Sequence, residues 1–169
     1  AFEKWLLDMV AIATVADMVP MIGESRTLTK YGLLVLNRPR RIGLQKLMQE
    51  AGIMHADGTF KHAVTTDTIG FQLAPRINAA GRLDHANVAY GLLTAEYGAP
   101  AIDLAFSLEQ NNTERRERTT RFVEQAKWQV NDSQKEQSVL CVFGEEWTTG
   151  IVGLIASNLV QEFYKPSLA

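Results

Sequence analysis

The stretch that decides the fold runs from residue 100 to residue 131 and reads PAIDLAFSLEQNNTERRERTTRFVEQAKWQVN. Its apolar residues keep helical spacing at both ends, whereas its middle, residues 109–121, is polar. A continuous helix of this length spans roughly 48 Å at 1.5 Å per residue. A helix with two apolar ends and a solvated middle is typical of a connector between two packed bodies, so we place a domain boundary inside it.

The residues before this helix have the pattern of a small helical domain. Residues 3–16 form a helix rich in Ala, Leu and Val that ends before Pro20, because proline disfavours the α-helical conformation of the residue that precedes it. Thr65-Thr66-Asp67 is a plausible cap for a later helix, and Pro75 is expected to kink or stop that helix. Asn87 is expected to cap one more short helix.

The residues after the long helix change to an α/β pattern. Residues 138–143 form a continuous apolar and β-branched run, which predicts a buried strand. A glycine-bounded loop at 144–150 is followed by helical spacing over 151–163, and the last residues read as a turn toward a strand that is not reached. We therefore expect a mostly α-helical chain that ends with the first β-α unit of an α/β domain.

Composition limits the class of protein. The 169 residues are 46% hydrophobic and 21% charged, which is ordinary for a globular protein, and the net charge of −2 excludes a bulk polycation. A single cysteine excludes an intramolecular disulfide framework and indicates a reducing compartment, so we expect a cytoplasmic protein without membrane association. The chain opens inside an apolar run and ends in a turn, and we expect it to be an internal piece of a longer protein.

Asp17 is the first candidate for chemistry. It follows an apolar helix, where a rigid element would hold its carboxylate beside an opening, and hard cations such as Mg²⁺ and Mn²⁺ favour carboxylate oxygens. The alternative is an aspartate that merely ends a helix in a turn. The histidines at positions 55, 62 and 85 have no regular ligand spacing, so we assign them no metal.

Three further segments could bind phosphate. Arg76, Asn78 and Arg82 lie within seven residues among small side chains, and guanidinium groups match phosphate oxygens; they could equally be cations at the end of a helix. The loop that ends at Gly150 precedes a helix, although its two glutamates oppose an anion. The charged stretch 109–121 reads first as a solvated face with Glu114–Arg118 and Glu117–Arg121 pairs, and second as a nucleic-acid track; the basic residues at positions 38, 40 and 41 are equally open.

The order of these motifs is more specific than any one of them. The segment ATVADMVP at 13–20, then GFQLAPRINAAGRL at 70–83, then the charged helix and WTTGIVGLIAS at 147–157, resembles the RecJ family of single-stranded-DNA-specific exonucleases in the DHH phosphoesterase superfamily. The resemblance covers essentially the whole chain. It implies that residues 1–99 are the C-terminal helical part of a DHH catalytic domain, 100–131 the connecting helix, and 132–169 the truncated start of a DHH-associated domain.

The resemblance also implies roles for single residues. Asp17 matches the last metal-binding aspartate of the catalytic domain, which binds two Mn²⁺ or Mg²⁺ ions, and is therefore expected to be catalytic. Arg76, Asn78 and Arg82 are expected beside the metal cleft, where they could engage DNA phosphates, and Gly150 is expected to bind nucleic acid as well. The Asp-His-His triplet and the earlier aspartate motifs are absent from this sequence, and Thr148 stands where the family commonly has histidine.

The activity that the resemblance implies is metal-assisted hydrolysis of single-stranded DNA from its five-prime end, in DNA repair and recombination. Expected partners are single-stranded DNA and DNA-repair or single-strand-binding proteins, and a monomer is expected. One alternative is another DHH phosphoesterase: an oligoribonuclease, a cyclic-dinucleotide phosphodiesterase or a pyrophosphatase. The other is a non-catalytic relative that binds nucleic acid or replication proteins. Because Asp17 alone cannot form a two-metal site, this chain by itself is expected to be inactive and to bind metal weakly.

Overall fold

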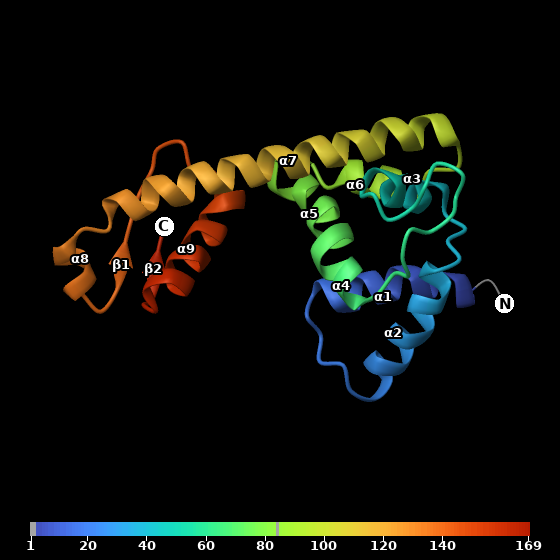
Figure 1. Ribbon diagram of the computed structural model, residues 1–169, viewed down its shortest axis with the longest axis horizontal. Coiled ribbons are helices and arrows are strands. Elements are labelled where there is room, and N and C mark those ends of the chain that lie inside the picture. The colour runs from blue at the N-terminus through green and yellow to red at the C-terminus, as the bar shows by residue number, and fades with distance from the viewer. Residues whose placement is uncertain (1–2, 84) are drawn as a thin grey trace.

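The computed structural model describes residues 3–83 and 85–169, and its dominant element is one long helix. This helix, α7 (Gly98–Gln129), has 32 residues and lies close to the predicted range. Two packed bodies lie on the same side of α7 in Figure 1: a first body made by the elements before it and a second body made by the elements after it. The predicted fold class, mostly helical with one small β-α unit, is confirmed.

The first body begins with two helices that cross at close range. A short 3₁₀ turn, η1 (Glu3–Leu6), leads into α1 (Leu7–Ala16), and α2 (Gly23–Leu36) folds back against it. Gly32 lies at their contact, where an added Cβ would stand 2.3 Å from the Leu7 carbonyl oxygen and 2.5 Å from the Ala11 Cβ. A residue without a side chain is therefore required for α1 and α2 to approach this closely.

Three further segments complete the middle of the first body. Helix α3 (Ile42–Glu50) is followed by a loop and by the short helix α4 (Thr66–Thr68). The cap predicted at Thr65 is confirmed, since its hydroxyl accepts from the Thr68 backbone N–H at 3.3 Å and its own N–H donates to the Thr68 hydroxyl at 3.1 Å.

Pro75 does not stop the helix in which it lies, contrary to one of the two outcomes expected. A π-helical segment, η2 (Ile69–Leu73), leads directly into α5 (Ala74–Leu83), and the Ala74 N–H donates to the Ile69 carbonyl in the wider π register. Proline lacks an N–H and crowds the carbonyl four residues earlier, so a widened turn immediately before it lets the helix continue.

Helix α6 (Asn87–Leu93) is the last of the first body, and its predicted cap is wrong. Asn87 is the first helical residue and makes no side-chain cap; instead, the imidazole Nδ1 of His85 accepts from the Asn87 backbone N–H at 3.2 Å. A histidine nitrogen two residues before can satisfy a free N–H at a helix start as a Ser or Asp oxygen would.

The second body is a small β-α-β unit. After α8 (Asp132–Glu136) come β1 (Leu140–Cys141), α9 (Thr149–Phe163) and β2 (Ser167–Leu168). The two strands pair in parallel, so a short strand is reached where the sequence predicted none. The strand predicted at 138–143 is shorter than expected. Its backbone hydrogen bonds to the second strand run from the Leu140 N–H to the Pro166 carbonyl and from the Val142 N–H to the Leu168 carbonyl. It is also not buried on both faces, since Cys141 is exposed.

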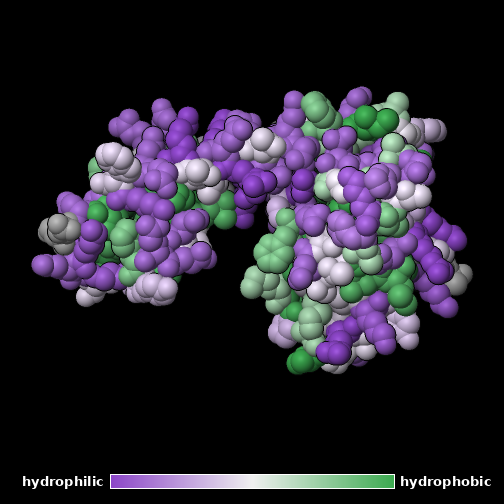
Figure 2. Space-filling model, viewed as in Figure 1, coloured by the Kyte–Doolittle hydropathy of each residue, from purple (hydrophilic) through white to green (hydrophobic). Residues whose placement is uncertain are grey.

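Each body has its own hydrophobic cluster, and α7 contributes to both. Ala101, Ala105 and Leu108 pack into the first cluster, whereas Phe122, Val123 and Ala126 pack into the second. Figure 2 shows hydrophobic residues gathered on the surface of the first body that faces the second one. No helix among the described residues combines the length and the hydropathy needed to cross a lipid bilayer.

Replacing Gly32 with Ala tests the close approach of α1 and α2. The Cβ would meet backbone and side-chain atoms of α1, and we expect the free energy of unfolding to fall by about 1–3 kcal/mol. Gly153→Ala in α9 is the matched control, because an added Cβ there meets nothing within 4 Å, and it should raise stability by about 0.5–1 kcal/mol. Both values come from urea unfolding; equal effects of the two substitutions would contradict this packing.

Candidate nucleic-acid and metal-binding site

Asp17 lies at the end of α1 in a tight helix-terminating turn. The Met18 N–H donates to the Val15 carbonyl at 3.1 Å and the Val19 N–H to the Thr14 carbonyl at 3.1 Å, which together form a Schellman motif. Met18 takes the left-handed position of this motif with φ of 55°, where glycine is usual. The turn leaves the Asp17 side chain exposed, without a hydrogen bond or ion pair among the described residues.

The carboxylate of Asp17 is suited to be one ligand of a hard cation, but it is not a metal centre. Among residues 3–83 and 85–169, no three or more His, Cys, Asp or Glu side chains are grouped so that they could hold a metal ion. Three or more oxygen or nitrogen ligands from the protein are the usual requirement for a dedicated site. The residues present therefore fit only one position of the two-metal site that the resemblance implies.

Arg76 lies on α5 with its guanidinium already occupied by Glu109 of α7. Its Nε and Nη2 both donate to the Glu109 carboxylate, the second at 3.3 Å, and its Nη1 donates to the Gln72 carbonyl at 2.7 Å. The two side chains are only 14% and 27% exposed. The pair thus joins α5 to α7 and orients the Arg76 fork, while one N–H of each terminal nitrogen stays without a protein acceptor.

Arg82 belongs to the first body and Gly150 to the second, and the fold brings these two residues into contact. Arg82, at the end of α5, donates from Nη1 to the Gly150 carbonyl at 2.8 Å. An added Cβ at Gly150 would lie 2.4 Å from the Arg82 carbonyl oxygen, so α9 starts against the backbone of α5 only because this residue is glycine. Asn78, one helical turn before Arg82, is exposed and has no side-chain hydrogen bond among the described residues.

The five residues selected from the sequence are thus linked only in part. Arg82 and Gly150 are in direct contact, and Arg76, Asn78 and Arg82 share α5. No hydrogen bond or ion pair among the described residues joins Asp17 to any of them. That Asp17 and Arg76 face one common concavity stays a prediction.

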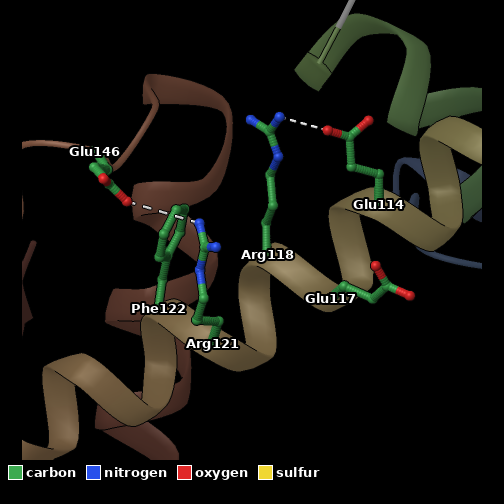
Figure 3. A pocket seen from close by; sticks show the side chains of 6 residues that line it. All are labelled: Glu114, Glu117, Arg118, Arg121, Phe122 and Glu146. Atoms are coloured by element: carbon green, nitrogen blue, oxygen red, sulfur yellow. Dashed lines mark hydrogen bonds and ion pairs between the residues drawn. The ribbon is translucent and has the colours of Figure 1, made fainter.

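The arginines of α7 divide into paired and unpaired ones. Arg118 pairs with Glu114 as the sequence predicted, whereas the predicted Glu117–Arg121 pair is wrong, because Arg121 lies 3.8 Å from Glu146 in the loop before α9. Figure 3 shows these side chains around a pocket beside α7. In it the Arg121 guanidinium lies 4.8 Å from the centre of the Phe122 ring. Because Arg118 and Arg121 already have carboxylate partners, this pocket attracts an anion only weakly.

Arg115 is a residue to which reasoning from the sequence gave no role of its own, since it was considered only within the charged stretch 109–121. It is half-buried, its Nη2 donates to the buried Asn112 side-chain oxygen at 3.1 Å, and its buried Nε has no hydrogen-bond partner in the part of the chain that the structure describes. Burial, and then the positive charges of Arg82 and Arg116, lower the pKa of Arg115 below its usual value. The signal in the sequence was the helical spacing itself, because Arg115 continues the buried positions of Leu108 and Asn112.

The basic residues at 38–41 belong to a separate surface. The Arg40 guanidinium lies over the Trp5 ring at 3.4 Å, and Arg41 donates from Nε to the buried Asp8 carboxylate at 2.8 Å. These contacts fasten the loop before α3 to the start of α1. They explain two of the three arginines as structural contacts of the first body.

The chain is similar over nearly its whole length to known nucleases. It is 38% identical over 163 residues to the single-stranded-DNA-specific exonuclease RecJ of Bacillus subtilis (strain 168), covering 96% of this chain and 20% of that protein. It is 32% identical over 169 residues to the same exonuclease of Escherichia coli (strain K12), covering 97% of this chain and 28% of that one. The chain therefore spans about a fifth to about a quarter of the length of these relatives. No family model matches it.

Solved structures agree with the sequence comparison. RecJ from Thermus thermophilus in complex with Mn²⁺ superposes with a TM-score of 0.84 at 27% identity, covering 97% of this chain and 24% of that one. A manganese-bound exonuclease RecJ superposes with a TM-score of 0.82 at 27% identity, covering 97% of this chain and 40% of that one. The resemblance to RecJ proteins that the sequence indicates is therefore confirmed as a similarity over nearly the whole of this chain.

Glu109→Gln tests whether the Arg76 pair holds α5 on α7. The substitution leaves a largely buried guanidinium without its charged partner, and we expect the free energy of unfolding to fall by about 1–3 kcal/mol. Glu114→Gln, which removes the exposed partner of Arg118 on the same helix, should cost about 0.5 kcal/mol or less. A double-mutant cycle with Arg76→Gln measures the coupling, and a coupling no larger than that of Glu114 with Arg118 would refute the assignment.

Proposed function

We propose that this chain, as a segment of a RecJ-type protein, is part of a metal-dependent exonuclease that hydrolyses single-stranded DNA from the 5′ end. The observation that carries the proposal is the extent of the structural likeness. It covers 97% of the chain at a TM-score of 0.84, and so includes both bodies together with α7 between them. A role in DNA repair and recombination, with single-strand-binding proteins as further partners, follows as part of the same proposal.

The two bodies and α7 have separate roles in this proposal. Residues 1–99 are assigned to the catalytic domain, 100–131 to the connecting helix and 132–169 to the start of the domain that helps to grip the strand. Two separate hydrophobic clusters, both with buried residues of α7, support this division. A single strand that lies between the bodies would be contacted by both of them. The space between the bodies would be too narrow for a duplex.

Asp17 is proposed as a metal ligand. Its exposed and unpaired carboxylate, held at a rigid helix end by a strained turn, supports the assignment. A bound Mn²⁺ or Mg²⁺ would supply Lewis-acid chemistry for phosphodiester hydrolysis. Residues 3–83 and 85–169 supply no cluster of three or more such ligands, so Asp17 is proposed as one ligand of a site that needs others beyond these residues.

Arg76, Asn78, Arg82 and Gly150 are proposed to bind the strand. The free N–H groups of Arg82 and the exposed Asn78 amide can donate to phosphate oxygens, whereas Arg76 would act with the two N–H groups that Glu109 and Gln72 leave free. Gly150 contributes by letting α9 approach α5, so that both bodies present their polar groups at one place.

A chimera tests the function of this chain in a complete protein. The matching segment of Bacillus subtilis RecJ is replaced by this chain, and release of nucleotides from single-stranded DNA is followed with Mn²⁺. We expect exonuclease activity on single strands, and no comparable activity on oligoribonucleotides, cyclic dinucleotides or pyrophosphate. A folded but inactive chimera, or one that prefers another substrate of this panel, would overturn the proposal.

Asp17→Asn in this chimera tests the metal ligand. Removing one negative oxygen ligand should lower turnover by about 100-fold or more. Asp103→Asn, an exposed carboxylate on α7, is the control and should stay within about twofold. The 169-residue chain by itself should show no turnover of single-stranded DNA with Mn²⁺, and turnover by it would contradict the incomplete site.

A further inference from the structure

We propose that Arg115 joins Arg82 to form a binding site for one phosphate of the nucleic-acid backbone, at the place where α5, α7 and α9 meet. The proposal rests on the proposed function and deepens it, because it names a residue of the long helix as a contact of the strand. Reasoning from the sequence considered Arg115 only as part of the charged stretch 109–121, and the resemblance gave it no role.

The buried face of α7 is apolar at both ends of the helix and polar between them. Leu108 and Phe122 are fully buried, and between them the same face carries Asn112, Arg115 and Thr119. The Thr119 hydroxyl donates to the Arg115 carbonyl at 2.7 Å, and among the described residues it accepts no hydrogen bond from the Arg115 guanidinium. A purely structural connector would be expected to continue its apolar stripe across the junction or to leave the junction exposed.

Two buried donors at this part of α7 lack an acceptor. They are Nε of Arg115 and Nδ2 of Asn111, and neither has a hydrogen-bond partner among the described residues. Native proteins pair nearly all buried donors, so an unpaired donor calls for an explanation such as a bound ion. Two donors without an acceptor favour a ligand rich in acceptor oxygens, which describes a phosphate.

The charges around Arg115 lead to the same ligand class. Besides burial, the groups that lower its pKa are both positive, namely Arg82 and Arg116. Among the described residues, no carboxylate accepts a hydrogen bond from Arg115 or forms an ion pair with it. Arg118 and Arg121, farther along the helix, each have a glutamate beside them. A partly buried guanidinium beside two other cations, without a carboxylate, is an uncompensated charge that an anion would balance.

The position of the pair fits a strand that passes between the bodies. Arg82 lies in the last turn of α5 and donates to the Gly150 carbonyl near the start of α9, so both bodies and α7 meet there. Figure 1 shows the end of α5 and the beginning of α9 close to the middle of α7. A phosphate held there would contact the first body through Arg82 and the connecting helix through Arg115.

Binding of a fluorescent single-stranded oligothymidylate by the 169-residue chain, measured against salt concentration, tests the site. Each phosphate contact on a single strand contributes a slope of about 0.7 in the dependence of log K on log salt. We expect Arg115→Gln to weaken binding by about tenfold and to reduce the slope by about 0.7, with Arg115→Lys between it and the unaltered chain. Arg121→Gln removes an equal charge from the same helix and should leave the slope unchanged. Circular dichroism checks that each variant is folded.

Inorganic phosphate provides a second measurement that separates the site from the function. At equal ionic strength, phosphate should raise the thermal midpoint of the unaltered chain relative to chloride, acetate should not, and Arg115→Gln should abolish the shift. If Arg115→Gln abolishes the shift but the unaltered chain binds no oligonucleotide, the result would support the phosphate site and overturn strand binding. If the salt slopes of Arg115→Gln and Arg121→Gln agree, or if phosphate stabilises both variants equally, the proposal is wrong. A shift produced equally by acetate would indicate a carboxylate site and also overturn it.

Discussion

Helix α7 is shared by two hydrophobic cores, and its helical phase determines where the two bodies lie. Leu108 ends the buried stripe of the first core and Phe122 begins that of the second. Between these two residues the helix advances roughly 21 Å and returns to within about 40° of a whole number of turns. Both cores are therefore attached to nearly the same face, so the two bodies lie on one side of α7 (Figure 1).

Because of this arrangement, the middle of α7 lies beside the contact between the two bodies. The end of α5, from the first body, and the start of α9, from the second, both lie there, and the Arg82–Gly150 contact joins them. Two adaptations of the backbone allow this approach. The π segment before Pro75 lets the helix continue to Arg82, and the absence of a side chain at Gly150 lets α9 begin against the α5 backbone.

Arginines that look alike in the sequence have different tasks once their neighbours are known. Arg118 is held by Glu114 and Arg41 by Asp8, so these two contribute mainly to structure, whereas Arg76, held by Glu109, has only part of its guanidinium left for the strand. Arg115 lies among cations and has a buried Nε without an acceptor. The difference is one of local charge and burial, because a guanidinium whose donors are satisfied by a carboxylate has less to offer a phosphate.

The sequence by itself determined the elements whose cause is local. The apolar spacing of 100–131, the cap at Thr65 and the order of motifs that resembles RecJ were all present in the chain. The sequence could not show that the His85 imidazole, rather than the Asn87 side chain, accepts a hydrogen bond at the start of α6. Nor could it show that Arg121 lies beside Glu146 rather than Glu117, or that Arg115 is half-buried. These features depend on which side chains other elements bring within a few ångströms, and residues far apart in the chain are brought together only by packing on α7. For the same reason, the sequence could nominate Asp17, Arg76 and Arg82 one by one, but only the tertiary structure decided which cations are paired and which are left for a ligand.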